Sequence, residues 1–380
     1  MLHAVQPGDG GVARVVIDLV RDQLAAGLRV AVACPPGTEL AAAVRAEGAE
    51  AYDWRAGREP GPALLRETRE LGRLLRAVRP TLVHAHSAKA GLCARLALRG
   101  RVPTVYQPHA WSFEAVGGTT AALARVWERA AARWTARIVC VSAAERRTGE
   151  DAGVRAAWSV IHNGVDAARF APPADDADAA PSPGPECELP GSGPLVVCVG
   201  RLCRQKGQDV LLDAWPEVLA AVPDARLVLV GDGPDAAALR AAADRYFSVH
   251  FTGAVADPAP WYRAADLVVL PSRWEGMALA PLEAMASGRP VVVGDVDGAR
   301  ESLPPGHEEH CLVPSGDPAA LAAALGRLLG RAGLRHSLGR EAREHVLSRF
   351  DVRRTGAAVA ELYREVAGVR CTEHREPIAQ

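Results

Sequence analysis

The chain has 380 residues and a formal net charge of −1, with 49% apolar and 23% charged residues. This length suggests two ordinary domains, and the composition is that of a globular protein rather than a disordered chain. A net charge so close to zero argues against a protein that coats nucleic acid, so we expect no nucleic-acid partner. Two residue types are scarce, because the only lysines are Lys89 and Lys206 and the only asparagine is Asn163. In an arginine-rich chain, each of these three residues therefore gains weight as a specific chemical requirement.

The N-terminal segment and the cysteines bear on the compartment. Residues 1–5 have no basic region followed by an apolar core, so we expect no signal peptide. A membrane span requires about 18 uninterrupted apolar residues, and no apolar run in the sequence is that long. The eight cysteines are scattered without a CxxC pair, which favours reduced thiols. We therefore expect a cytoplasmic protein, with a place at the inner face of the membrane left open.

The first half of the chain alternates short β-rich runs with helical patterns. After a first strand at the N-terminus, the pattern predicts strands over 28–33, 81–85, 104–107, 137–141 and 159–161, and helices over 12–26, 63–78, 88–98 and 120–134. The helix over 63–78 sets arginines against leucines. We expect an amphipathic surface helix there, and we leave open a weak peripheral association with an anionic membrane.

A Pro- and Asp-rich segment, 169–194, then breaks the alternation, with a composition typical of a linker. Beyond it, strands are predicted over 195–199, 226–230, 249–252, 267–270 and 291–293, again with helical patterns between them. Alternation on both sides of one linker predicts an α/β protein with two doubly wound domains that face each other across a cleft.

We expect the chain to divide into an N-terminal Rossmann-like domain over 1–168, a linker over 169–194 and a C-terminal Rossmann-like domain over 195–350. A helix over 351–368 would pack back toward the N-terminal domain, and a tail over 369–380 would follow.

Two glycine loops, 8–13 and 231–236, follow predicted strands and fit the GxGxxA pattern of dinucleotide-binding proteins. Neither of the next predicted strands ends in an acidic residue that could hold a ribose, so we do not expect a dinucleotide. We interpret Gly10 and Gly11 as a loop that lets a phosphate approach a helix N-terminus. For Gly231 and Gly233, a ligand contact and a simple strand-to-helix turn both stay open.

The loop 200–207 directly follows a predicted buried strand and carries several cations. Arg201 offers a planar guanidinium and Lys206 a point charge, and together at the start of a helix they would suit a diphosphate. The alternative is a solvated basic loop, which we accept for Arg204. The scarcity of lysine argues against that alternative for Lys206.

The segment 272–286 adds two carboxylates. Glu275 lies in the loop after the predicted strand 267–270, and Glu283 lies about a turn into the next helix. Carboxylates at these places can accept hydrogen bonds from sugar or ribose hydroxyls. The pair alone would mean little, but together with Gly276 and the loop 200–207 it becomes a strong signal.

These motifs resemble those of the retaining glycosyltransferases of family four, which have the GT-B fold. The matches are collinear over nearly the whole chain. They are Gly10-Gly11, His84-Ala85-His86-Ser87-Ala88-Lys89-Ala90-Gly91, His109-Ala110-Trp111, Asn163-Gly164-Val165-Asp166, Gly200-Arg201 with Lys206-Gly207, Gly231-Asp232-Gly233-Pro234, and Glu275 with Glu283.

The resemblance implies that the domain over 1–168 binds the acceptor and that the domain over 195–350 binds the nucleotide sugar, and it implies a role for each matched position. The catalytic group would be His109, Glu275, Arg201 and Lys206, with the two cations on the donor diphosphate and His109 near the reacting carbons of the sugar. The other donor-binding residues would be Gly10, Gly11, Gly233, Gly276, Met277, Ala278, Leu279 and Glu283, the last of these on the ribose. Where the family commonly has Phe-Gly after Glu-Gly, this chain has Met277-Ala278, which puts the donor preference in doubt.

Family members need no metal, and this chain has no DxD sequence at a matching place. The resemblance therefore implies no cofactor and no metal, only a nucleotide-sugar cosubstrate, for which we favour a UDP-sugar over a GDP-sugar. His84, His86 and Lys89 lie in a run that is similar to that of family members building envelope glycans. We expect these three residues and Asn163 to contact the acceptor or the cleft. A purely structural role for the two histidines remains the alternative.

The expected activity is front-face, metal-independent transfer of a hexose or N-acetylhexosamine to a hydroxyl of a glycan, lipid-linked or natural-product acceptor. No Asp or Glu stands out as a nucleophile, so the leaving phosphate would accept the acceptor's proton. Two alternatives remain: a nucleotide-sugar epimerase on the same fold, and a non-catalytic nucleotide-sugar-binding protein. The oligomeric state is not predicted.

Overall fold

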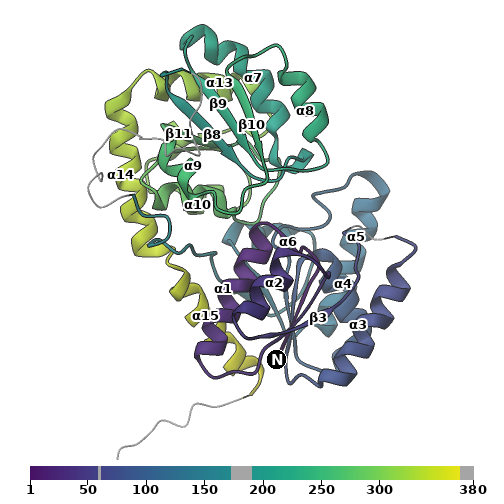
Figure 1. Ribbon diagram of the computed structural model, residues 1–380. Helices are drawn as coiled ribbons and strands as arrows, with labels where there is room; N and C mark the ends of the chain where they lie inside the picture. Colours follow the sequence, from purple (N-terminus) through teal and green to yellow (C-terminus); the bar gives the residue numbers. More distant parts are fainter. Residues whose placement is uncertain (59–60, 173–190, 369–380) are drawn as a thin grey trace, which may run out of the picture.

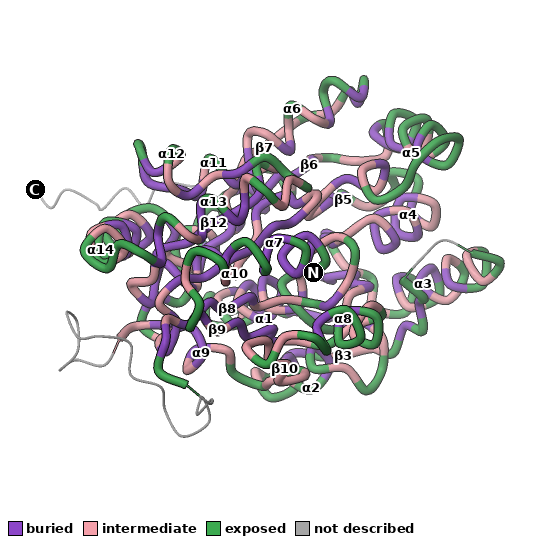
Figure 2. Tube along the Cα trace, turned by 90° about the horizontal axis from the view of Figure 1, so that it is seen from above, coloured by how far each residue is buried: buried purple, intermediate pink, exposed green. Residues whose placement is uncertain are grey.

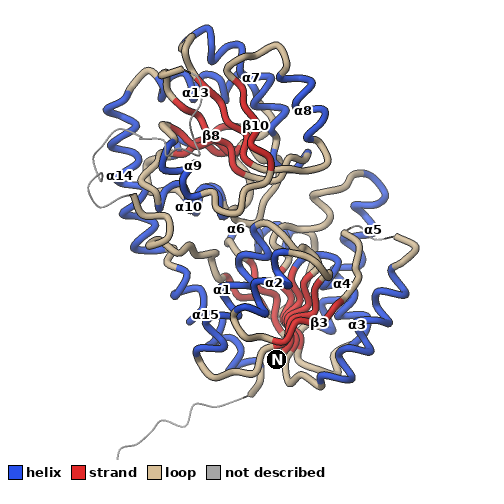
Figure 3. Tube along the Cα trace, in the orientation of Figure 1, coloured by secondary structure: helices blue, strands red, loops and turns tan. Residues whose placement is uncertain are grey.

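The computed structural model describes residues 1–58, 61–172 and 191–368, and it forms two α/β halves, each with one parallel β-sheet between helices (Figures 1 and 3). The N-terminal half has the strands β1 Leu2–Val5, β2 Ala31–Cys34, β3 Glu50–Asp53, β4 Val83–His86, β5 Thr104–Gln107, β6 Arg137–Cys140 and β7 Trp158–Val160. Its helices are α1 Gly11–Ala25, α2 Glu39–Ala46, α3 Leu64–Val78, α4 Ser87–Leu98, α5 Gly118–Ala131 and α6 Ala143–Asp151.

The C-terminal half repeats the plan. Its strands are β8 Leu195–Val199, β9 Arg226–Val230, β10 Val249–Gly253, β11 Leu267–Leu270, β12 Val291–Gly294 and β13 Leu312–Val313. Its helices are α7 Gln208–Ala221, α8 Ala236–Ala243, α9 Ala259–Ala264, α10 Leu279–Ala286, α11 Ala299–Ser302, α12 Glu308–Cys311, α13 Pro318–Leu329 and α14 Ala332–Arg349, and α15 Val352–Val366 follows.

Both sheets have the strand order of a doubly wound fold. The orders are β3-β2-β1-β4-β5-β6-β7 and β10-β9-β8-β11-β12-β13. The central strands are buried on both faces because helices cover both faces, and Figure 2 shows the strands buried while helices such as α3, α5 and α14 expose one side. The predicted α/β class with two Rossmann-like domains is confirmed. In such folds the ligand lies beyond the carboxyl ends of the strands.

The last two helices run along one side of the molecule from the C-terminal half to the N-terminal half (Figure 1). Between α14 and α15 the chain bonds to residue 165, with Val165 donating to the carbonyl of Phe350 and Val352 donating to the carbonyl of Val165. Helix α15 then packs on α1, and its Leu362 and Tyr363 share an apolar cluster with residues of that helix. The bulk of the expected linker, residues 173–190, and the expected tail 369–380 lie outside the described residues.

The helices bear on whether the chain could span a membrane. Among the residues described, no helix combines the length and the apolar character needed to cross a bilayer. Helix α3 is amphipathic, as predicted, with Leu71 and Leu75 buried and Leu65 exposed.

Candidate active site between the two sheets

The strongest polar cluster of the cleft joins two loops of the C-terminal half. Lys206 donates from Nζ to Oε1 of Glu275 over 2.5 Å, and the same oxygen accepts from Oγ of Ser272 over 2.8 Å. Glu275 is buried and Lys206 is half-buried. The loops after β8 and β11 meet because these strands are neighbours in the sheet. An ammonium held this way is fixed in place but keeps part of its surface open to a ligand.

Arg201 lies on the same loop as Lys206 and is exposed. Within the described part of the chain, no ion pair or hydrogen bond involves its guanidinium. Arg204 is also exposed and lies over the ring of Trp274, at 5.6 Å from the ring centroid. Among the residues that the structure describes, the guanidinium of Arg201 is therefore free for an anion, while Arg204 remains at the surface as predicted.

Two helix N-termini meet at the cleft, one from each half. Helix α1 begins after Gly10, which has φ 79°, and α10 begins after Ala278; neither helix has a side-chain cap or an acidic residue in its first turn. A Cβ added to Gly11 would lie 3.8 Å from Cδ1 of Leu279, so the two helix starts are in van der Waals reach. Uncapped helix N-termini favour an anion.

Glu283 lies about one turn into α10, half-buried, and accepts from the hydroxyl of Tyr262 over 2.7 Å. Burial raises the pKa of its carboxyl above the ordinary value. The residue lines a cavity of about 280 Å³ between the two halves, together with Arg14 and Asp18 of α1 and Asp166 of the 163–166 turn. A carboxyl here faces a space large enough for a group of ribose size.

Gly276 lies at a close contact between the two halves. A Cβ at this position would lie 2.8 Å from Oε1 of Glu145, 2.8 Å from Cγ2 of Val141 and 3.1 Å from the amide nitrogen of Ala110. All three atoms belong to the N-terminal half. Glycine is therefore required at 276 by the contact between domains, in addition to any contact with a ligand. Met277, next in sequence, is buried, so its side chain does not simply line an open pocket.

His109 follows β5 on a strained turn, with φ 59° at His109 and φ 126° at Ala110. Left-handed backbone at residues with a side chain is costly and persists only where the surroundings enforce it. Glu145 supplies that support, because its Oε1 accepts from the amide of Ala110 and its Oε2 from the amide of Val141, both over 2.7 Å. Burial raises the pKa of Glu145 to about 8 and lowers the pKa of His109 to about 3.

Three residues expected in the acceptor cleft lie elsewhere. Lys89 is buried and donates to Oε2 of Glu67 over 2.6 Å, inside the N-terminal half. His84 and His86 are fully buried. Because these side chains point from β4 and α4 into the domain, they cannot touch an acceptor. Isolated burial of a lysine would be unfavourable, and the partner Glu67 explains its retention there.

Asn163, expected at the acceptor or the cleft, lies between the two halves. This residue is buried and donates from Nδ2 to the carbonyl of Met277 over 2.7 Å, which ties the two halves together. A Cβ on the next residue, Gly164, would lie 2.6 Å from Cα of Val352. The Asn163-Gly164 pair therefore holds the junction of the two domains with the last helix.

Gly231 and Gly233 have a structural explanation. Added Cβ atoms would lie 2.1 Å from the carbonyl oxygen of Gly200 and 2.3 Å from that of Leu202, respectively. The two glycines let the loop after β9 pack against the backbone of the loop that carries Arg201. This contact accounts for both glycines without a ligand.

The contacts that support the site come largely from residues that motif reading did not select. Glu145 is one, and Glu301 is another: its two carboxylate oxygens accept from the amides of Ala143 and Ala144, each over 2.8 Å, across the two halves. Only the Ser142 cap before α6, with Glu145 three residues later, carried a recognisable local signal. Glu301, a partner from the other half, had no such signal in the sequence.

Comparison with known proteins agrees with this architecture. Residues 9–169 match the family model described as Glycosyltransferase Family 4, and residues 193–331 match the one described as Glycosyl transferases group 1. A D-inositol 3-phosphate glycosyltransferase of Streptomyces bingchenggensis is 30% identical, over 96% of this chain and 87% of the relative. The lipopolysaccharide core biosynthesis mannosyltransferase LpsB of Rhizobium meliloti is 38% identical, over 42% of this chain.

Coverage of the relatives differs widely. The chain spans about half the length of the first curated relatives that it matches, with 46% of LpsB and 57% of a GDP-mannose-dependent phosphatidylinositol monomannoside mannosyltransferase of Mycolicibacterium smegmatis, 37% identical. Among solved structures, Anabaena Alr3699/HepE in complex with UDP and glucose superposes with a TM-score of 0.79 at 23% identity, over 95% of this chain and 98% of that chain. At this identity the likeness shows the GT-B fold.

The two family models together cover most of the chain, and the Streptomyces relative aligns over nearly all of it. The chain belongs to glycosyltransferase family 4.

Proposed function

We propose that the protein is a retaining glycosyltransferase that moves a hexose or N-acetylhexosamine from a nucleoside-diphosphate sugar to a hydroxyl of a glycan, lipid-linked or natural-product acceptor. The observation that carries the proposal is that the ammonium of Lys206, fixed on Glu275, and the uncapped N-termini of α1 and α10 lie at the cleft. Arg201, whose guanidinium has no partner among the described residues, lies on the same loop as Lys206. These groups suit a diphosphate.

The donor would lie with its diphosphate between the two halves. Arg201 and Lys206 would bind it from the C-terminal half, and the amides after Gly10 and Gly11 would reach it from the N-terminal half. Glu283 would accept from the ribose, facing the cavity beside α1. Glu275 serves two purposes in this arrangement, because it fixes Lys206 and can accept from a sugar hydroxyl.

The chemistry would be electrostatic. Breaking the bond between sugar and phosphate develops negative charge on the leaving diphosphate, and the two cations with the two helix N-termini stabilise that charge. Removal of one such contact typically costs about 10²–10³ in rate. His109 has a neutral imidazole, because burial lowers its pKa to about 3, and so would contribute hydrogen bonding rather than charge.

No carboxylate is placed as a nucleophile in this scheme, so we propose front-face attack without a metal, with the leaving phosphate accepting the acceptor's proton. The names of relatives include GDP-mannose-dependent and UDP-galactose-dependent transferases. We keep a UDP-sugar as the first donor to test, with GDP-mannose second.

The test is a panel of UDP-, GDP- and dTDP-sugars, each with and without glycan, lipid-linked and polyol acceptors, followed by release of nucleoside diphosphate. The proposal predicts release that depends on an acceptor and a product whose anomeric proton shows the same configuration as the donor. An inverted product would contradict the retaining mechanism. Release without any acceptor, or tight binding without release, would instead favour the epimerase or the binding protein.

A further inference from the structure

A hydrogen-bonded chain of side chains runs through the interior of the N-terminal half and ends at His109. Nε2 of His3 lies 2.8 Å from Oε1 of Gln23, Nδ1 of His3 lies 2.9 Å from Nε2 of His86, and Nδ1 of His86 lies 3.1 Å from Nε2 of His109. The members come from α1, β1, β4 and the turn after β5. His3 and His86 therefore each bond through both ring nitrogens, and His109 bonds to His86 through Nε2.

The chain is closed to solvent except at His109. Gln23, His3 and His86 are buried, and His109 is half-buried at the cleft. Burial lowers the pKa of His3 to about 4 and that of His86 well below its ordinary value. The rings are therefore neutral, and a neutral imidazole has one N–H donor and one acceptor nitrogen.

With Oε1 of Gln23 facing His3, these contacts set the tautomer of every ring. Oε1 of Gln23 can only accept, so His3 must carry its proton on Nε2 and accept at Nδ1. His86 must then donate from Nε2 and accept at Nδ1, and His109 must donate from Nε2. Nδ1 of His109 is then the ring nitrogen that bonds to none of these side chains, and it carries a lone pair.

We propose that Gln23, His3 and His86 are positioning residues that fix the tautomer of His109, so that its Nδ1 accepts a hydrogen bond from a hydroxyl of the donor sugar. The use of His109 toward the donor rests on the proposed function; the tautomer itself does not. The strained turn at His109, held by Glu145 from the other side, fixes where the ring lies, and the chain fixes which nitrogen accepts.

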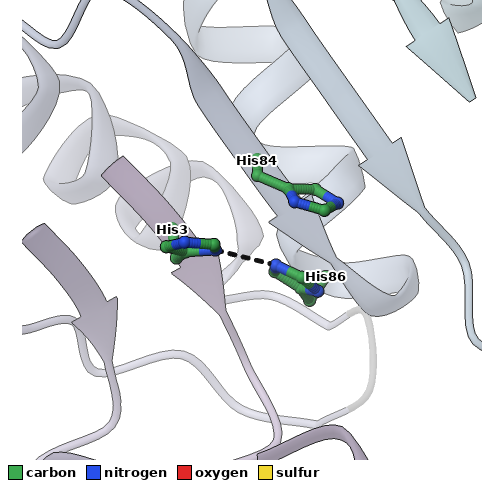
Figure 4. Close-up of side chains that lie close together, drawn as sticks. All are labelled: His3, His84 and His86. Atoms are coloured by element: carbon green, nitrogen blue, oxygen red, sulfur yellow. Dashed lines mark hydrogen bonds between the residues drawn. The ribbon is translucent and has the colours of Figure 1, made fainter. Parts of the chain in front are cut away.

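His3 and His86, together with His84, also form a cluster of the kind that can hold a metal ion. Nitrogens of His3, His84 and His86 lie within 4.8 Å of one another. However, the facing nitrogens of His3 and His86 bond to each other, and Figure 4 shows that bond with His84 set apart from it. The ring of His84 lies over that of His86, with centroids 3.9 Å apart, and its Nδ1 bonds to the hydroxyl of Tyr363 over 2.6 Å. Both nitrogens of His3 and both nitrogens of His86 already have hydrogen-bond partners, so the geometry favours the hydrogen-bonded chain.

The tautomer can be measured without any substrate. In protein labelled with 15N-histidine, long-range 1H–15N correlation spectra separate a protonated ring nitrogen from a bare one, and a His109→Gln variant assigns the signal. We expect His109 in the wild-type protein to be protonated at Nε2 and bare at Nδ1. A wild-type His109 protonated at Nδ1, or stoichiometric zinc that is lost in His84→Ala, would overturn the proposal.

Matched variants of Gln23 separate positioning from packing. Gln23→Glu keeps an acceptor facing His3, and Gln23→Met keeps the volume but removes the acceptor. The proposal predicts that Glu preserves the His109 tautomer and that Met gives a mixture. If Gln23 served only to fill space, Met would be tolerated and a buried Glu would be harmful, which is the opposite order.

The activity arm uses the donor identified by the sugar panel. We expect kcat of Gln23→Met to fall about tenfold, the effect of one hydrogen bond, while the affinity for free nucleoside diphosphate stays unchanged, and Gln23→Glu to restore the rate. An unchanged rate in His109→Gln would refute the role of His109 toward the donor, while the spectra would still decide whether the chain sets its tautomer. Unchanged spectra in Gln23→Met would refute the chain itself.

Discussion

Replacing Gly276 by alanine tests whether the two halves work in contact. The added Cβ would lie 2.8 Å from atoms of Glu145 and Val141 and 3.1 Å from the amide of Ala110, all in the opposite half. Two of these distances are shorter than a carbon atom accepts, so the halves must separate by several tenths of an ångström. Overpacking of this kind typically costs about 1–3 kcal/mol.

The strain falls on the contact between the halves rather than on either fold. At about 1.4 kcal/mol for each factor of ten, the closed arrangement becomes about 5–150 times less populated. We therefore expect kcat for sugar transfer to fall by about that factor and the melting temperature to change little. The affinity for free nucleoside diphosphate should fall by less than kcat, because Arg201 and Lys206 of the C-terminal half would still hold the diphosphate. Initial rates, differential scanning fluorimetry and titration calorimetry measure the three quantities.

Gly333→Ala is the matched control, because Gly333 is exposed in α14 and an added Cβ meets nothing within 4 Å. It should leave kcat unchanged and stabilise the helix by up to about 1 kcal/mol. A Gly276→Ala variant with the wild-type kcat would refute the reasoning, since the closed contact would then be dispensable for the reaction.

Three further predictions concern groups away from the diphosphate. The carboxyl of Glu145 has its pKa raised from 4.5 to about 8 by burial, so its contribution makes the folded protein less stable by up to ~5 kcal/mol as pH rises from 4.5 to 8. Urea unfolding should show Glu145→Gln losing that part of the pH dependence; identical curves would contradict this. Asn163→Ala removes the bond to the carbonyl of Met277 and should lower kcat about tenfold with folding preserved, whereas an equal loss of thermal stability would assign it to the fold. Lys89→Met leaves Glu67 buried without its partner, so unfolding experiments should show a loss of about 3–5 kcal/mol with normal kcat in the folded fraction; a selective loss of kcat would return Lys89 to the active site.

The repeated pattern of apolar strands made the fold predictable. The strands over 226–230 and 267–270 were predicted to the residue, because runs of Val and Leu covered on both faces have little alternative. The second strand was predicted to begin at residue 28 but begins at Ala31, since the chain turns at Gly27 and leaves Leu28 exposed. The edge strand β3 was missed because its side chains are largely unburied.

The site was predictable only where a motif is local. Lys206 and Glu275 lie 69 residues apart, yet each sits directly after a buried strand, so the sheet brings them together. Scarcity alone could not separate the two lysines. Both pair with a glutamate, but Lys89 does so inside the domain with Glu67, which lies on another helix. The contacts around His109 could not be predicted for the same reason: nothing near His109 in the sequence shows that His86 or Glu145 lies beside it.

The central claim is that the cleft binds a nucleoside diphosphate through Lys206. Calorimetric titration of UDP and of GDP into the wild-type protein, Lys206→Ala and Arg204→Ala tests it directly, because Arg204 is a cation on the same loop that lies over Trp274. The account predicts binding that weakens about 10–100-fold in Lys206→Ala and stays at the wild-type value in Arg204→Ala. Equal affinity in all three proteins, or equal losses in both variants, would contradict it.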